Sequence, residues 1–358
     1  MKKLDIYIIK KFLGTFFFAI SLLIIIVIVF DISEKIDDFL EKDAPLDKIL
    51  FSYYLNFIPY FVNLFVYLFT FIAVIFFTAK MASDTEIVAI LSSGISFWRM
   101  LRPYLISSVF LGLMSFYLAN FLIPITNMKM MEFEKEYIRN PFQYRERDIH
   151  MQIKPGTYVY MESYDNRANR GYKFSMEKFV DNKLVYKLNS NRIEWDSLSG
   201  KWKLKNYHIR ELDGKNETLV VGQEMDTLIN LHPREFTFII EDIKTMNYSS
   251  LRAFIEKEKL KGTQKIKEYE VEKHKRIAFP FATIVLTFIG VAISSRKVRG
   301  GIGMHLGIGL TITFSFILFL QITTVFATRG NLAPWLSVWI PNILFAIIGV
   351  YLLKIAPK

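Results

Sequence analysis

Six long apolar stretches constrain this chain of 358 residues more than any other feature of its sequence. Each is close to the roughly 20 residues that an α-helix needs to cross a hydrocarbon core about 30 Å thick. The stretches are residues 12–30, 57–78, 104–125, 277–294, 306–326 and 335–353. Because hydrophobic residues make up 52% of the chain and gather in these stretches, the sequence predicts an integral membrane protein with six transmembrane helices.

The order of the spans divides the chain into parts. Residues 1–126 hold three spans, residues 277–358 hold three more, and a long polar insert separates the two groups. Four lysines precede the first span, as basic residues precede the apolar region of a secretory signal peptide. Its apolar run is too long for such a region, however, and no small-residue cleavage site follows it. We therefore expect it to be retained as a transmembrane helix.

The distribution of Lys and Arg between the short loops predicts the orientation, because basic residues gather on the cytoplasmic side. One side holds Lys2, Lys3, Lys10, Lys11, Lys80, Arg99, Arg102, Arg296, Lys297, Arg299, Lys354 and Lys358. The other side holds only Lys35, Lys42, Lys48 and Arg329. Both termini and the loop around residues 83–96 are thus expected in the cytoplasm, and the insert is expected on the far side of the membrane.

The insert has the pattern of a β domain over residues 127–246. Short segments rich in Tyr, Val, Ile and Trp alternate with turn signals, as in "YKFSMEKFV" and "KWKLKNYHIREL". The turn signals are Asp165-Asn166, Asp181-Asn182, Ser199-Gly200 and Asp213-Gly214. The fold class is therefore an α-helical membrane protein with an inserted all-β domain, a sandwich, jelly roll or open barrel-like sheet.

Residues 247–276 predict a helical stalk between the β domain and the fourth span. "NYSSLRAFIEKEKLKG" has an Asn at its start, a Gly at its end, and Leu251, Phe254 and Ile255 on one face. A second charged helix, residues 264–276, leads into the fourth span. In the sixth span, Pro341 leaves a backbone carbonyl without its usual donor, which Asn342 or a neighbouring helix can satisfy.

The loop between the second and third spans contains an unexpected short helix, "SDTEIVAILSSGIS" at residues 83–96. Ser83 and Glu86 have the spacing of a capping box. Ile87, Ile90 and Leu91 follow with helical spacing, and Gly94 is suited to a helix C-terminus. One hypothesis is a helix that docks on a soluble ATPase through Glu86 and Asp84; the alternative is that these acids only cap a solvated loop helix.

Motifs for catalysis are not evident. The chain has no Cys, its five His fit no metal-binding spacing, and it lacks G-x-S-x-G and the phosphate-binding G-x-x-x-x-G-K-[ST]. We therefore assign no catalytic residue and no metal ligand. The net charge of +11 reflects largely the cytoplasmic Lys and Arg, so it does not indicate nucleic-acid binding.

The whole chain resembles the lipopolysaccharide-export permeases LptF and LptG. The resemblance covers the three-plus-three topology, the β insert, and three local segments in this order: "TEIVAILSSGIS", "HKRIAFPFA" (residues 274–282) and "NLAPWLSVWIPN" (residues 331–342). The character of "DISEKIDDF" after the first span favours LptG. The resemblance implies a bacterial inner-membrane protein that is not itself an enzyme.

The resemblance also implies partners and a route for the substrate. Two paralogous permeases pair over a dimer of the ATPase LptB, which uses ATP and Mg²⁺, so this chain binds no cofactor itself. Lipopolysaccharide enters between the first span of one permease and the fifth span of the other, and the β-jellyroll domains pass it to LptC and a periplasmic bridge. By position, Glu86 is the expected ATPase-coupling acid, with Asp84, Ile87, Ile90, Leu91 and Gly94 in the same helix.

The expected substrate contacts lie at the outer end of the first span and along the fifth. Lys35 and Lys42 can meet lipid A phosphates, although the neighbouring acids offer Lys35 a local salt bridge to Asp31 or Glu34 instead. In the fifth span Phe314, Gln321 and Thr324 are expected to line the cavity, since an intramembrane Gln favours protein or a cavity over lipid. Ordinary helix packing or lipid contact is the alternative for the aromatic residues.

Two other classes of protein remain as alternatives. A mechanotransmitting ABC subunit also lacks an ATP motif, but it usually carries its exported domain after the first of four spans. A membrane-anchored periplasmic enzyme or binding module would need a cluster of acids, bases or metal ligands in a cleft of the β domain.

Overall fold

The computed structural model describes residues 2–138, 147–214, 216–236, 240–263, 265–298 and 300–356. The chain forms two compact units. Met1–Ile138 and Lys267–Lys358 make the first, called here the membrane unit, and Arg139–Ile266 make the second, called here the β unit. The sequence predicts that the β domain begins at residue 127 and ends at residue 246, whereas the β unit begins at Arg139 and ends at Ile266. The difference arises because the helix after the third span continues to Tyr137, and the helix that begins at Tyr248 belongs to the β unit.

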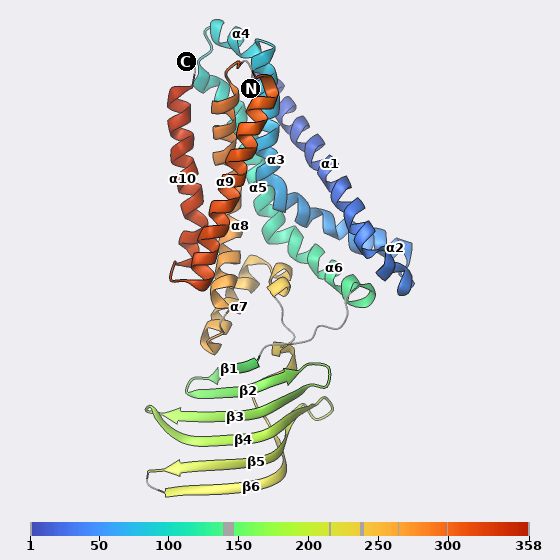
Figure 1. The fold of residues 1–358 in the computed structure, drawn as a ribbon, viewed down its shortest axis with the longest axis vertical. Coiled ribbons are helices and arrows are strands. Elements are labelled where there is room, and N and C mark those ends of the chain that lie inside the picture. Colours follow the sequence, from blue (N-terminus) through green and yellow to red (C-terminus); the bar gives the residue numbers. More distant parts are fainter. Residues whose placement is uncertain are drawn as a thin grey trace. The chain divides into compact units, whose positions relative to one another are not determined.

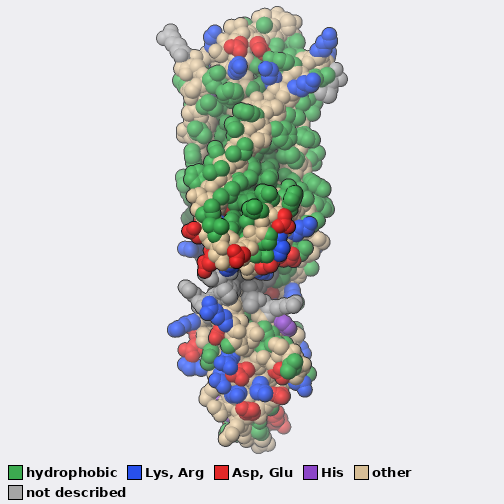
Figure 2. Space-filling view, turned by 90° about the vertical axis from the view of Figure 1, so that its right-hand side faces the viewer, with side chains coloured by type: hydrophobic (Ala, Val, Ile, Leu, Met, Phe, Trp, Pro, Cys, Tyr) green, Lys and Arg blue, Asp and Glu red, His purple; other side chains and the backbone are tan. Residues whose placement is uncertain are grey.

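Within the described residues, the membrane unit contains six helical segments long and apolar enough to cross a membrane, as the sequence predicts. Its elements are α1 (Lys3–Glu41), α2 (Leu46–Lys48), the π-helical η1 (Ile49–Tyr54), α3 (Leu55–Ser83), α4 (Glu86–Ser92), α5 (Phe97–Tyr117), the π-helical η2 (Leu118–Leu122), α6 (Ile123–Tyr137), α8 (Ile266–Ser294), α9 (Gly301–Arg329) and α10 (Pro334–Ile355). Figure 2 shows a broad hydrophobic belt on this unit, with charged side chains gathered at both of its ends.

Helix α3 lies in the interior of the bundle, where it packs against α1, α8 and α9 (Figure 1). Phe71 and Val74 of α3 are fully buried. Gly290 of α8 lies so close to them that an added Cβ would be 3.0 Å from a Val74 methyl group and 3.1 Å from the Phe71 ring. A glycine therefore permits the close contact of α3 with α8, and any larger residue would make its neighbours shift.

Pro341 interrupts the hydrogen bonds of α10, and a neighbouring helix compensates. A proline cannot donate to the carbonyl four residues earlier, which here belongs to Ser337. The Thr323 hydroxyl of α9 donates to this carbonyl at 2.6 Å, and the Asn342 amide donates to the Val338 carbonyl at 3.0 Å. Of the two possibilities left open by the sequence, the neighbouring helix satisfies the freed carbonyl.

In the part of the β unit that the structure describes, one antiparallel sheet has six strands in sequence order (Figure 1). The strands are β1 (Arg147–Lys154), β2 (Thr157–Asp165), β3 (Arg170–Val180), β4 (Lys183–Asp196), β5 (Lys201–Asp213) and β6 (Asn216–Thr227). All four predicted turn signals lie at the connections of consecutive strands, with Asp165 and Asp213 as the last residues of β2 and β5. The inserted all-β domain is thus confirmed, as an open sheet of consecutive hairpins.

One face of this sheet carries the core of the β unit. Phe174, Leu188 and Trp202 are buried there, and the Trp202 indole donates to the Leu231 carbonyl at 2.7 Å. The 3₁₀ turns η3 (Pro233–Phe236) and η4 (Ile240–Thr245) follow, and then α7 (Tyr248–Lys261) buries Leu251 and Ile255. The second helix expected in the stalk is the first part of α8, which continues without interruption into the fourth span.

Candidate functional site

The short helix predicted in the loop after the second span is α4, but it begins differently from the prediction. Ser83 is the last residue of α3, and Thr85 is the N-cap of α4 without a side-chain capping bond. The predicted capping box from Ser83 to Glu86 is therefore wrong. Because α3 continues through Ser83, the chain must reverse within two residues, and Thr85 adopts a left-handed φ of 62° that β-branched residues rarely take.

The two faces of α4 differ in their surroundings. Ile87 is only 2% exposed and packs in the main core of the membrane unit, against which Ile90 and Leu91 are also packed. On the other face Val88 is 57% exposed, and Asp84 is exposed just before the helix. Gly94 follows the helix with a φ of +81°, as predicted for its end. A helix held on one side and free on the other can receive a contact and pass its motion to the bundle.

The predicted coupling acid Glu86 is held by the first helix. The Tyr7 hydroxyl of α1 donates to both carboxylate oxygens, at 2.9 and 3.2 Å. Nearby, the Arg99 guanidinium of α5 makes a bidentate pair with Asp5 of α1, with distances of 2.6 and 2.8 Å. Sequence analysis did not find these links, because the partners lie 79 and 94 residues apart and no local pattern connects them.

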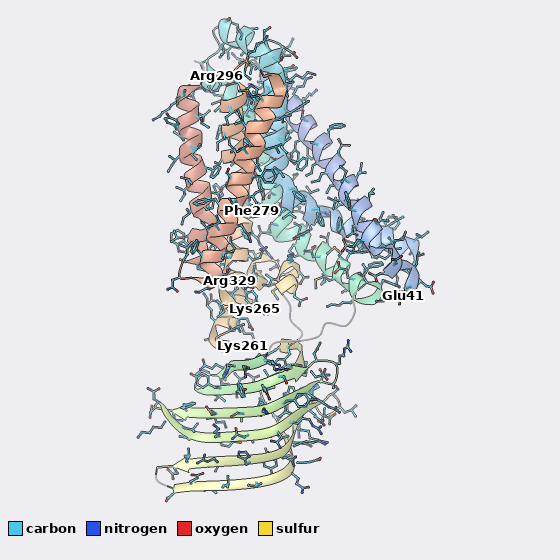
Figure 3. The ribbon with its side chains drawn as sticks, in the orientation of Figure 1. Glu41, Lys261, Lys265, Phe279, Arg296 and Arg329 are labelled. Atoms are coloured by element: carbon cyan, nitrogen blue, oxygen red, sulfur yellow. The ribbon has the colours of Figure 1, made fainter. Side chains whose placement is uncertain are left out.

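Other contacts join the helix ends around α4. The Lys297 ammonium donates to the Ser83 carbonyl at 3.2 Å, and the Arg296 guanidinium donates to the Ile355 carbonyl at the end of α10. The His305 ring lies 3.0 Å from the Arg296 carbonyl. Figure 3 shows Arg296 at the end of the membrane unit that carries α4, and Glu41 and Arg329 at its opposite end. A displacement of α4 would act on α1 through the bond of Tyr7 with Glu86, and the pair of Asp5 with Arg99 links α1 to α5.

At the opposite end, Lys35 belongs to a polar network. Its ammonium lies 2.7 Å from Asp31 and also contacts the Tyr53 hydroxyl. The Tyr53 and Tyr54 hydroxyls, which belong to η1, donate to Asp31 at 3.2 and 3.1 Å. The local salt bridge considered from the sequence is thus formed, with Asp31 as the partner. Lys42, by contrast, is exposed just after the end of α1.

The expected cavity residues of α9 lie on different sides of the helix. Phe314 is 68% exposed, and Gln321, two turns further on, is also exposed. The Thr324 hydroxyl is buried, and it has no hydrogen-bond partner within the described residues. The structure therefore gathers Phe314 and Gln321 on one uncovered face of α9, whereas Thr324 lies at the edge of the packed side.

Helices α1 and α9 are the two least covered spans of the described bundle. Only 22% of the apolar window of α1 and 28% of that of α9 is buried, against 56% for α8. Large side chains such as Phe18 and Phe30 of α1 are 68% and 72% exposed. These two helices leave continuous apolar surface for lipid, substrate or another membrane protein.

Comparison with known families decides the assignment. The model of the family described as lipopolysaccharide export system permease LptF/LptG matches residues 6–355. The chain belongs to the LptF/LptG permease family. No curated protein matched the chain. The match includes both LptF and LptG, so the assignment to LptG stays a prediction.

Membership of the LptF/LptG family makes this chain a multi-pass membrane permease subunit and not an enzyme. Among the described residues, no group of three or more His, Asp and Glu side chains could hold a metal ion. Helix α4 is packed on the bundle through Ile87 and bonded to α1 through Glu86, and α1 and α9 expose apolar surface. Both are features of a protein that moves a substrate.

Proposed function

We propose that this chain is one of two paired permease subunits of an ATP-driven transporter, which extracts lipopolysaccharide from the inner membrane and passes it to a periplasmic bridge. The single observation that carries the proposal is α4, a short helix packed on the bundle through Ile87 with its opposite face free. ATP and Mg²⁺ are used by a partner ATPase dimer resembling LptB, and this chain binds no nucleotide. A paralogous permease and an LptC-like protein complete the complex.

The distribution of charge supports the orientation of the proposal. Lys80, Arg99, Arg102, Arg296 and Lys297 lie in or beside the loops at the α4 end, which by the positive-inside rule is cytoplasmic. The α4 helix is then accessible to the ATPase, and the β unit is periplasmic. Closure of the ATPase dimer on ATP pushes α4, and the links from Tyr7 and Arg99 carry this motion into α1 and α5.

The uncovered faces of α1 and α9 support the route of the substrate. Acyl chains lie between α1 of one permease, the helix that in this chain carries Phe30, and the exposed face of α9 of the other, the helix that in this chain carries Phe314. Each permease contributes one of these two helices to each side of the cavity. Lys35 meets a lipid phosphate when its bond with Asp31 is exchanged for one with the anion. Because both partners of this pair are largely covered, 19% and 12% exposed, the exchange needs a movement of α1 relative to η1.

The coupling role is tested by co-purification of the full chain from membranes. Wild type is expected to bring down a nucleotide-binding subunit and a second six-span permease. Glu86→Arg, which reverses the charge beside Tyr7, is expected to lose the ATPase but keep the paralogue, and Glu86→Gln to weaken both association and export. Glu41→Arg, an exposed acid at the opposite end, is the control for ATPase association. Unchanged association and export in Glu86→Arg would refute the coupling role.

The substrate route is tested by placing a photo-crosslinking amino acid at Phe314 or at Phe316 of the chain in its complex. These residues lie two positions apart on α9, but Phe314 is 68% exposed and Phe316 is 1% exposed. Crosslinks to lipopolysaccharide are expected at position 314 in an ATP-dependent manner, and none at 316. Equal labelling at both positions, or labelling at neither, would contradict the route.

A further inference from the structure

The β unit carries an open pocket for which the transport mechanism proposed above gives no use. Its volume is about 520 Å³, and side chains from β1, β2, β3, β4 and β5 line it. This volume lies within the range of pockets that hold small ligands. Most of its lining residues lie on the polar face of the sheet, opposite the core residues Leu188 and Met161, and Val159 and Phe174 of the core also border it.

The strand register explains why these side chains meet. His150 pairs with Tyr160, Tyr160 with Ser175, Ser175 with Asn189, and Asn189 with His208. Directly opposed residues in an antiparallel sheet point to the same face, so these five side chains form one row across five strands. The row combines an aromatic ring with groups that donate and accept hydrogen bonds.

A crease in the sheet runs beside this row. Asp148, Lys173 and Asn206 have left-handed φ values of 54°, 48° and 49°, and the ladder pairs are interrupted at these positions. Left-handed conformations are costly for residues with a Cβ, about 1–2 kcal/mol each. Backbone strain of this kind is often kept at binding sites. Lys173 lines the pocket, so the crease shapes its edge.

Several polar groups in the row are fixed before any ligand binds. The Tyr160 hydroxyl donates to Asp148 at 2.8 Å, which raises the pKa of Tyr160, and the His150 ring lies against the Tyr160 ring with centroids 4.8 Å apart. The Asn189 amide lies 3.1 Å from the His208 ring nitrogen. The Ser175 hydroxyl, in contrast, is buried without a hydrogen-bond partner within the described residues. Such a group in a native protein indicates a missing partner.

The charges around the pocket indicate a neutral ligand. Lys173 pairs with Glu162 at 2.8 Å, and Lys187 pairs with Glu177 at 2.7 Å. Because both lysines at the pocket already have carboxylate partners, the pocket has no surplus positive charge to select a phosphate. The row is also too polar for an acyl chain, since its amide, hydroxyl and imidazole groups would lose their hydrogen bonds against one.

We propose that this pocket binds a neutral sugar unit of an oligosaccharide. The apolar C–H face of the sugar packs on the Tyr160 ring, and its hydroxyls bond with Ser175 and Asn189. The proposal rests on the transport function only for the source of the sugar, which is either the saccharide part of the transported glycolipid or a separate cell-wall glycan. The acyl chains of a glycolipid would remain outside this face of the sheet.

Saturation-transfer NMR on the full chain in lipid nanodiscs tests the proposal. The probes are deacylated lipopolysaccharide oligosaccharide and N,N′-diacetylchitobiose, one for each source. Saturable binding of at least one probe is expected, and the probe that binds identifies the source. Tyr160→Ala should weaken binding at least tenfold and Ser175→Ala about threefold. Tyr160→Phe, which keeps the ring, should bind much more tightly than Tyr160→Ala.

Ser197→Ala is the matched control for Ser175→Ala, because Ser197 is exposed in the turn after β4 and lies outside the pocket. It should bind like wild type. The proposal is overturned if neither probe shows saturable binding. It is also overturned if Tyr160→Ala, Tyr160→Phe and Ser175→Ala all bind the probe as tightly as the Ser197→Ala control. The probes lack acyl chains and need no ATPase, so this result is independent of the export and co-purification experiments that test the transport function.

Discussion

Helices α1 and α9 differ from α3 and α8 in how much of their apolar surface the chain itself covers. In the segment that contains α3, 50% of the apolar window is buried, and in α8 the value is 56%, but in α1 it is only 22%. Yet α1 is the most apolar of the six segments. Hydropathy therefore identifies the helices that enter the membrane but does not tell which of them are covered by protein.

Glycines indicate which face of a helix is covered, which hydropathy does not. Gly290 of α8 contacts α3, and an added Cβ on Gly112 of α5 would lie 3.1 Å from the Pro280 carbonyl of α8. Gly14 of α1 has no neighbour within 4 Å of the position of a Cβ. Close helix contacts in membranes depend on such small residues. On α9, a Cβ added to Gly309 would lie 2.3 Å from an Ile75 methyl group of α3, whereas Gly303 and Gly307 have no neighbour within 4 Å. Glycines that meet a neighbour thus lie on the covered faces of the helices, including that of α9.

The largest difference is expected between two phenylalanine truncations. Phe71→Ala removes a fully buried ring of α3 and should lower the free energy of unfolding by about 3–5 kcal/mol. Phe314→Ala removes a ring that is 68% exposed on α9 and should leave stability nearly unchanged. Thermal unfolding of the detergent-solubilised chain measures both. Similar losses for the two variants would mean that the isolated chain buries the surface of α9.

A substitution that adds volume tests the same contrast. Gly290→Leu must displace Val74 and Phe71, which are fully buried, and overpacking of this kind costs about 1–3 kcal/mol. Gly14→Leu places the same side chain on α1, where no atom lies nearby. The first variant should unfold at a lower temperature than wild type and the second at the same temperature. A destabilised Gly14→Leu would show that α1 is covered.

The sequence predicted much of the fold because its strongest signals are local. Six apolar runs predicted six spans, and the four turn signals predicted the hairpins from β2 to β6, two of them through Asp181 and Gly214, which take positive φ values of 48° and 61°. These features depend on residues within a few positions of one another.

Contacts between distant segments could not be predicted in the same way. The bond of Tyr7 with Glu86 depends on α3 continuing through Ser83, which the capping pattern at Ser83 and Glu86 contradicted. Likewise, the row from His150 to His208 is visible only once the register of five strands is known. A local pattern gives the helix or strand, whereas packing of the whole bundle decides where it starts and what it meets.

The packed side of α9 provides a smaller test. Thr323→Val keeps the shape of the side chain but leaves the Ser337 carbonyl, already deprived of a donor by Pro341, without a hydrogen bond. We expect a loss of about 1–2 kcal/mol, the cost of a buried unsatisfied acceptor. Ser315→Ala is the control, because Ser315 is exposed and its hydroxyl, among the described residues, bonds the Thr311 carbonyl of its own helix. Equal stability of the two variants would argue against the role given to Thr323.

The smallest effect is expected at the end of α1 that carries Asp31 and Lys35, where polar bonds take the place of helix packing. Tyr54→Phe removes one of the two tyrosine hydroxyls that donate to Asp31, while Lys35 and Tyr53 still hold the carboxylate, so about 0.5–1 kcal/mol should be lost. Tyr351→Phe, at a residue 63% exposed on α10, is the matched control. Because one hydrogen bond between η1 and Asp31 of α1 is lost, α1 should separate from η1 more readily. If that separation admits the substrate, crosslinking of lipopolysaccharide at position 314 should rise. Lower crosslinking in Tyr54→Phe would instead mean that the network holds α1 in the conformation that receives the substrate.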